Sequence, residues 1–230
     1  MKFTSTTPSP IMKPTLFLSI PVFSSLVLVA APLASAAVIY PSSATTDGGT
    51  SSSLFDVSNL FDESVTGPGD TLPGTVSNNN IAYVSADPPT GGFPVTITVD
   101  FTEAVDLSAF YLWNISHNTS DNPRDRGVRD FSLTFYDGAG ATGSQIGTVY
   151  SATAAIGPLS GVAIPSQTFT FASAYEGVLS VEFKMINNQA DPTRWVGARE
   201  IAFAPVPEPS SSLLGGLCGV ALLLRRRRSV

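Results

Sequence analysis

The sequence has very little of the side-chain chemistry from which most enzyme active sites are built. Its 230 residues include one cysteine, Cys218, and one histidine, His117. Cys218 lies in an apolar run near the C-terminus, so no disulfide forms within the chain and the folded domain contains no thiol nucleophile. A zinc hydrolase typically needs several His or Cys ligands, and a serine triad needs a His base near a nucleophile turn, but no G-x-S-x-G occurs. Paired carboxylates stay possible by count alone, but no motif singles out a pair, and we predict that the protein is not an enzyme.

Charge is also scarce and is unevenly distributed. Charged residues make up 13% of the chain, with 18 acidic and 12 basic side chains. Six of the basic residues lie in the terminal segments: Lys2, Lys13, Arg225, Arg226, Arg227 and Arg228. The part between these segments is therefore strongly acidic. Because phosphate binding needs clustered Lys and Arg, we expect no binding to nucleic acid, whereas an acidic domain attracts divalent cations.

The N-terminus has the pattern of a secretory signal peptide. Lys2 and Lys13 precede an apolar run from Leu16 to Val29, and the small residues Ala34-Ser35-Ala36 follow it. A basic region, a short apolar region and an A-x-A site are typical of a segment removed by signal peptidase. The alternative is a membrane anchor, but Pro21 and the modest length of the run argue against it. We predict a signal peptide over residues 1–36.

The C-terminus, residues 206–230, has three parts in order. A short Pro-Glu-Pro motif comes first, then an apolar run from Leu213 to Leu224, then the four arginines. Twelve helical residues measure about 18 Å, well short of a hydrocarbon core of ~30 Å. With Ser210 to Ser212 and snorkelling arginines the run makes a strained transmembrane helix, whose arginines stay cytoplasmic. Such a segment suits a temporary stop in the membrane during export better than a permanent anchor. The Pro-Glu-Pro motif, with the residue before it, consists of Val206, Pro207, Glu208 and Pro209.

This tail resembles the PEP-CTERM sorting signal of Gram-negative bacteria. The resemblance implies that exosortase, a transpeptidase-like membrane enzyme, recognises Val206 to Pro209 together with the arginine cluster and removes the tail. It also implies an inner-membrane intermediate followed by the cell surface or the extracellular space, often in species that make extracellular polysaccharide. The alternative is a Pro-rich linker ahead of an ordinary anchor.

Between the two ends, residues 37–205 show a dominant period of two. Apolar and polar residues alternate in several segments, and no long helical period occurs, which is typical of antiparallel strands with one buried face. Phe110–Trp113 is apolar on both faces and indicates a central strand. We therefore predict one all-β domain, an antiparallel β-sandwich or jelly roll of about eight strands. The other predicted strands lie in Val95–Phe101, Phe131–Phe135, Thr168–Phe171, Leu179–Met185 and Glu200–Phe203.

Four short segments of this domain resemble motifs of discoidin-type, galactose-binding-like domains, the coagulation factor 5/8 C-type fold. They are Val57–Asp62, Val95–Phe101, Arg126–Phe131 together with Asp137-Gly138, and Val196–Ile201. Glu63 stands where the family usually has Gly, and the Gly that follows the second motif is missing. The resemblance implies the fold but no particular ligand, because this fold hosts many functions.

The same resemblance implies a calcium site. In discoidin-like domains with such a site, the early loop and the glutamate of the closing strand lie close together, which corresponds here to Asp62 and Glu200. Hard cations prefer carboxylate and carbonyl oxygens. The alternative is that these are solvated surface acids, since no EF-hand spacing occurs.

The loop from Asn114 to Arg126 is the best candidate for a ligand surface. It joins two predicted strands and carries amide, imidazole and guanidinium groups, including Asn114, His117, Arg124 and Arg126. Such planar polar groups suit sugar hydroxyls, and Trp195 could add an aromatic face from a neighbouring loop. Alternatively Trp195 is a packing residue, as we expect for Trp113.

These observations predict an exported, non-catalytic protein that binds extracellular polysaccharide. The alternative is a structural or protein-interaction module of the envelope without a glycan site.

Overall fold

The computed structural model describes residues 38–50, 52, 54–62, 70–72, 82–115, 126–159, 161–189 and 194–207. The predicted signal peptide and the sorting tail beyond Pro207, including its apolar run, lie outside these residues. None of the helices within them is long and apolar enough to cross a membrane. In chain order the elements are β1 (Ser43–Thr46), η1 (Val57–Leu60), β2 (Thr71–Leu72), β3 (Tyr83–Val84), β4 (Val95–Asn114), β5 (Asp130–Tyr136), η3 (Ala139–Ala141), β6 (Gln145–Thr153), β7 (Ile164–Pro165), β8 (Gln167–Met185) and β9 (Gly197–Pro205).

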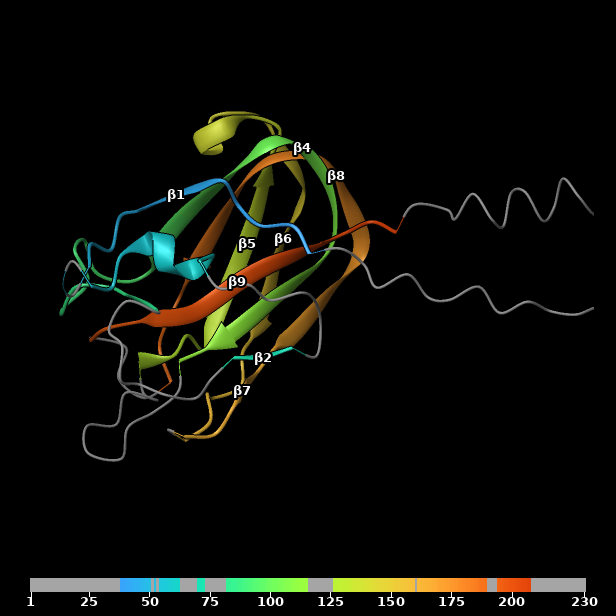
Figure 1. Cartoon of the computed structure of the whole chain (residues 1–230). Coiled ribbons are helices and arrows are strands. Elements are labelled where there is room, and N and C mark those ends of the chain that lie inside the picture. Colours follow the sequence, from blue (N-terminus) through green and yellow to red (C-terminus); the bar gives the residue numbers. More distant parts are fainter. Residues whose placement is uncertain are drawn as a thin grey trace, which may run out of the picture. The chain divides into compact units, whose positions relative to one another are not determined.

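Two long antiparallel strands, β4 and β8, form the frame of the domain. They contain 20 and 19 residues, and their pairing shifts register several times between Asp100 and Ala109. Bulges of this kind bend a strand pair, and Figure 1 shows both ribbons arching over at one end of the domain. The sheet therefore folds over on itself into two facing layers, and the prediction of an all-β antiparallel sandwich is confirmed.

Each layer contains one half of both long strands. The first half of β4 pairs with β1 and with the second half of β8, which continues through β5 to β6. The second half of β4 pairs with the first half of β8 and with β9, whose other neighbour is β3. The seven strands form one connected sheet, and a separate pair, β2 and β7, lies beside it.

The sequence predicted two separate strands where the structure has the single strand β4. Val95–Phe101 and Phe110–Trp113 are both part of it. Thr102, Glu103 and Ala104 are exposed and interrupt the alternation, yet pairing resumes at Val105. The interruption is thus a bend in one strand. Thr168–Phe171 and Leu179–Met185 likewise belong to one strand, β8.

The alternating residues fill the space between the layers, as predicted. Val95, Ile97 and Val99 are fully buried on β4, and their neighbours in the same layer on β5 and β8 are buried beside them. Phe110 lies in the middle, with its ring centroid 5.3–5.5 Å from those of Phe131, Phe183 and Phe203. These rings come from β5, β8 and β9, so one side chain ties both layers together.

The second half of β4 is buried on its outer face as well. Tyr111 and Trp113 form a smaller cluster there with Leu72 of β2 and Ile164 of β7. The indole N–H of Trp113 donates to the backbone oxygen of Asp70 at 3.0 Å. The short β2–β7 pair thus covers this face, which explains why the strand is apolar on both sides and confirms that Trp113 is a core residue.

The chain enters and leaves the domain at the same end, which we call the tether end. Ile39 and Phe203 exchange two backbone hydrogen bonds of 2.8 and 3.0 Å, and the N–H of Val206 donates to the oxygen of Asp106. The opposite end, which we call the loop end, contains Asn114, Ile115 and the described segments 126–129, 154–159, 186–189 and 194–196. β9 runs from the loop end to the tether end, a distance of roughly 25 Å at ~3.3 Å per residue.

Candidate functional site

The predicted ligand residues fall at the loop end as far as they are described. The loop after β4 is described only at its two ends, Asn114–Ile115 and Arg126, while His117 and Arg124 lie outside the described residues. The structure brings Arg126 and Trp195 together, although 69 positions separate them in the sequence. The candidate site is therefore built around Trp195.

Trp195 packs against two guanidinium groups. The Cζ atoms of Arg126 and Arg194 lie 4.0 and 3.9 Å from the centre of its ring. Such cation–π contacts contribute about 0.5–1 kcal/mol each at exposed sites. Nη2 of Arg194 also donates to Oδ2 of Asp87 at 2.8 Å, and the Arg194 side chain remains half exposed. An aromatic ring and guanidinium N–H groups thus share one partly exposed surface.

Asn114 was predicted to contact a ligand, but its side chain lies inside the domain. Its side chain is fully buried, and Nδ2 donates to the backbone oxygens of Val128 and Ala155 at 2.8 and 2.9 Å. Oδ1 accepts from the N–H of Ile115 at 3.1 Å. Both ends of the amide therefore hold backbone, and Asn114 fixes two neighbouring segments of the loop end to each other.

Other amide side chains that the sequence analysis missed hold the same end. Nδ2 of Asn188 donates to the backbone oxygen of Trp195 at 2.8 Å, which fixes the main chain beneath the indole. Nε2 of Gln189 donates to the oxygens of Val128 and Ala154. The signal in the sequence was the run of three amides, Asn187-Asn188-Gln189, shortly after the alternating strand Leu179–Met185.

Asp130, at the start of β5, completes this support. It accepts hydrogen bonds from Asn187 Nδ2 and Thr153 Oγ1, both at 2.7 Å, and from Arg129 Nε at 3.1 Å. The bonds from Asn187 and Thr153 hold the pKa of the Asp130 carboxyl below its usual value. The carboxylate is thus charged and occupied by its own neighbours, which makes it a positioning group.

A second polar group supports the loop after β1. The hydroxyl of the fully buried Tyr83 donates to the backbone oxygen of Gly49 at 2.9 Å and lies 2.9 Å from Oγ1 of Thr46. Burial raises the pKa of Tyr83 to about 12, so the phenol stays neutral and remains a donor.

The two predicted calcium ligands lie on neighbouring elements. Asp62 is exposed just beyond η1, whereas Glu200 is fully buried in β9, and η1 packs against β9. Among the residues that the structure describes, no three His, Cys, Asp or Glu side chains gather in a group that could hold a metal ion. Residues 63–69, which include Glu63, are outside that set, and the calcium site stays a prediction.

Comparison with known proteins identifies the tail. The family model described as the PEP-CTERM protein-sorting motif matches residues 205–228, so the predicted sorting motif is confirmed. The chain therefore carries the signal of an exported protein that is processed at the membrane. No curated protein matches the chain in sequence.

Several solved β-domains resemble the chain in three dimensions. One is the family 32 carbohydrate-binding module of C. perfringens NanJ, solved with galactose, which has 14% identity and a TM-score of 0.47 and covers 73% of this chain and 97% of that one. Another is an F5/8 type C domain from Bacteroides fragilis, with 9% identity, a TM-score of 0.47 and coverage of 75% and 97%. A chitosan-binding module from Paenibacillus has 16% identity, a TM-score of 0.44 and coverage of 72% and 95%. With TM-scores below 0.5, these likenesses carry no argument about a site.

Proposed function

We propose that the protein is an exported, non-catalytic glycan-binding protein that presents its loop end to extracellular polysaccharide. The observation that carries this proposal is the cluster of Trp195 with Arg126 and Arg194 on a partly exposed surface. Indole and guanidinium groups together suit a sugar, because the part of the ring that the two guanidinium groups leave uncovered contacts apolar C–H groups while the N–H groups donate to hydroxyls. Arg124 and His117, on the same loop as Arg126, are the further contacts that we propose.

The rigidity of the loop end supports this function. Binding sites that are already ordered lose less entropy when a ligand binds. The buried amides of Asn114 and Asn188 order the segments that carry Arg126 and Trp195. The tether end lies at the far end of β9, so a protein that is attached through its processed C-terminus has its candidate site directed away from the point of attachment.

Replacing Trp195 with alanine is expected to weaken retention on exopolysaccharide from the producing organism by about tenfold or more, and Arg124→Ala by less. The larger effect is expected because loss of the indole also removes the surface on which Arg126 and Arg194 pack. Affinity electrophoresis of the exported protein in gels that contain the polysaccharide measures retention. The control is Thr102→Ala, which removes an exposed side chain at the bend of β4, far from the loop end, and should be retained as wild type is. Retention equal to wild type in both test variants would contradict the proposal.

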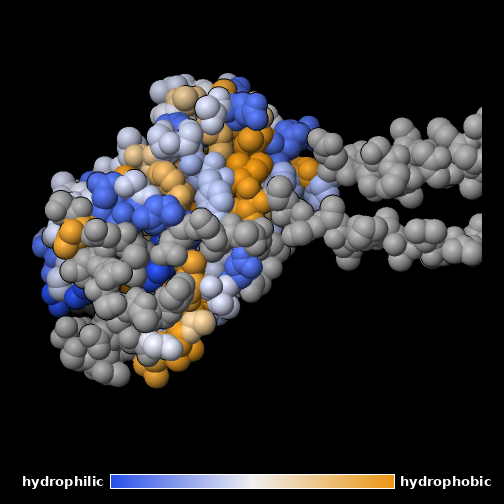
Figure 2. Space-filling view, viewed as in Figure 1, coloured by the Kyte–Doolittle hydropathy of each residue, from blue (hydrophilic) through white to orange (hydrophobic). Residues whose placement is uncertain are grey.

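A protein-interaction module is the second candidate, and one observation favours it. Three large apolar side chains, Ile156, Leu159 and Val162, are 44–53% exposed on the loop before β7. Figure 2 shows an orange patch at the bottom of the molecule, where Figure 1 places β7. Exposed apolar patches commonly mark protein contacts. If the protein is such a module, a change at Leu159 should weaken binding of the partner protein. Trp195→Ala should leave that binding unchanged.

Processing at both ends is the next expected result. Exported protein should begin near Ala37 and end close to Pro207–Pro209, because the A-S-A site and the sorting motif direct two cleavages. We propose signal peptidase and an exosortase-type enzyme as the proteases. Intact-mass analysis of the exported protein measures both ends directly. Retention of Leu213 to Val230 in that material would contradict the second cleavage.

Calcium binding by Asp62 and Glu200 is a further proposal. A cation that binds only the folded state raises the melting temperature, by an amount that grows with the ratio of free calcium to the dissociation constant. We expect EDTA to lower the melting temperature of the exported protein and added calcium to restore it. Asp62→Asn should abolish the response to EDTA, whereas Asp137→Asn, an exposed acid in another loop, should leave it unchanged. An unchanged melting temperature, with no calcium in metal analysis, would show that the site does not exist.

A further inference from the structure

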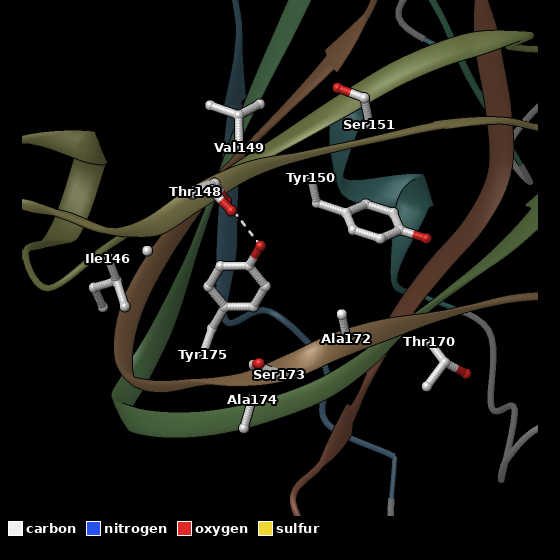
Figure 3. A pocket seen from close by; sticks show the side chains of 11 residues that line it. Ile146, Thr148, Val149, Tyr150, Ser151, Thr170, Ala172, Ser173, Ala174 and Tyr175 are labelled. Atoms are coloured by element: carbon white, nitrogen blue, oxygen red, sulfur yellow. Dashed lines mark hydrogen bonds between the residues drawn. The ribbon is translucent and has the colours of Figure 1, made fainter.

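A groove of about 540 Å³ opens along the side of the domain, between β6 and the first half of β8. These two strands are the edges of the two layers, and Figure 3 shows the groove from close by. The rings of Tyr150 and Tyr175 lie in the space between the two ribbons. The volume is in the usual range of small-molecule sites, roughly 300–1,000 Å³.

The lining contains no charged side chain, although the domain as a whole is acidic. Four hydroxyl side chains line it, Thr148, Ser151, Thr170 and Ser173, and all are exposed. None of these four hydroxyls has a hydrogen-bond partner in the part of the chain that the structure describes. The groove is thus a row of neutral donors and acceptors beside aromatic rings.

The two tyrosines have different roles. Tyr175 stacks on Phe135, with ring centroids 3.7 Å apart, and its hydroxyl donates to the backbone oxygen of Thr148 at 2.8 Å. It therefore closes the floor by joining β8 to β6. Tyr150 is half-buried against Phe171, and within the described residues its hydroxyl makes no hydrogen bond. Burial raises the pKa of Tyr150, which keeps this hydroxyl neutral and able to donate.

The shape of β6 disfavours an extended peptide as the occupant. The pairing of β6 with β5 shifts register between Leu133 and Phe135, and Gly147 has a φ of +62°. A Cβ atom at Gly147 would lie 3.0 Å from Cε1 of Tyr175, so glycine allows the close contact between β6 and this ring. A bulged edge strand does not offer the regular row of N–H and C=O groups that an added strand needs.

We propose that this groove is a second ligand site, which binds a short neutral oligosaccharide. The hydroxyl groups of the sugar replace water on the Thr, Ser and Tyr150 hydroxyls, and its C–H faces pack against the Tyr150 ring. Anionic glycans are repelled, because the lining holds no cation and the domain is acidic. The groove lies on the side of the domain and shares no residue with the Trp195 cluster, so this inference stands independently of the loop end. Two weak sites on one protein increase its avidity for a polymer that carries many copies of the ligand.

The test uses the exported protein and calorimetric titration with neutral cello-, laminari- and malto-oligosaccharides, and with an oligouronate of the same length. Thr170→Lys places a long charged side chain in the groove from an exposed strand position, and we expect about tenfold weaker binding of the neutral ligand. Thr102→Lys is the matched control, because Thr102 is also an exposed strand threonine but does not line the groove. It should bind as wild type does. Tyr150→Phe, which keeps the packing on Phe171, should bind several-fold more weakly.

Trp195→Ala should leave this binding unchanged. If no neutral oligosaccharide binds, or if Thr170→Lys binds as wild type does, the proposal is wrong. Loss of binding in Trp195→Ala would assign the ligand to the loop end and overturn the groove site. A dimer in sedimentation analysis that Thr170→Lys dissociates would also overturn it, since the groove would then be an interface between two copies of the chain.

Discussion

Replacing Phe110 with alanine should lower the free energy of unfolding by about 3–5 kcal/mol, the range measured for large aromatic truncations in cores. Phe110 is fully buried and contacts four aromatic rings, with centroid distances between 5.3 and 6.2 Å. These rings belong to both layers, so the cavity cannot close by the movement of one strand. The loss should therefore lie at the upper end of the range.

Chemical denaturation of the exported protein, followed by tryptophan fluorescence, measures this loss. Val162→Ala is the control, because Val162 is 53% exposed and its truncation should change stability by less than about 0.5 kcal/mol. If Phe110→Ala fails to fold, Phe110→Leu keeps the comparison possible with a smaller expected loss of about 1–2 kcal/mol. A change in Phe110→Leu no larger than that of the control would contradict the central place of this ring.

Replacing Asn114 with alanine should cost about 2–4 kcal/mol and also reduce glycan retention, although the side chain touches no solvent. The substitution leaves the backbone oxygens of Val128 and Ala155 without their amide donor. A buried acceptor without a partner costs about 1–3 kcal/mol, and two are affected here. The segment that carries Arg126 loses its attachment at the same time.

Hydrogen exchange distinguishes this local effect from a general loss of stability. Amide protons of residues 126–129 and 154–157 should exchange faster in Asn114→Ala, while those in the middle of β4 and β8 should change only in proportion to global stability. Gln145→Ala removes an exposed amide side chain from a strand and serves as the control. A uniform change in exchange, with retention equal to wild type, would show that Asn114 does not position the site.

The alternation of apolar residues predicted most of the sheet, because a period of two arises when a strand has one buried face and one solvent-exposed face. Phe131–Phe135 and Leu179–Met185 are examples. The bend of β4 was not predictable from the sequence. A segment such as Thr102 to Ala104 can occur equally well in a loop between two strands and at an exposed bulge within one strand. Trp113 was assigned correctly because its strand is apolar on both faces.

The candidate site was predicted less completely than the fold. A sequence places Asn114 at the end of a strand, but it does not say whether the amide points to solvent or to backbone carbonyl groups. The contact of Arg126 with Trp195 depends on how β9 lies beside β4, which local patterns do not contain. The groove was missed altogether, because its lining residues look like ordinary polar positions and the two strand edges meet only after β4 and β8 bend.

The course of β9 has a mechanical consequence. Trp195 precedes the first residue of this strand, and the chain leaves from its last residue toward the sorting motif. If the processed C-terminus is attached and Trp195 holds a ligand, a pulling force between the two runs along the backbone of a single strand. That backbone is already extended, so it yields almost no length and transmits the pull through covalent bonds. The hydrogen bonds to β4 lie across the direction of the force, and the rest of the domain experiences little of the pull.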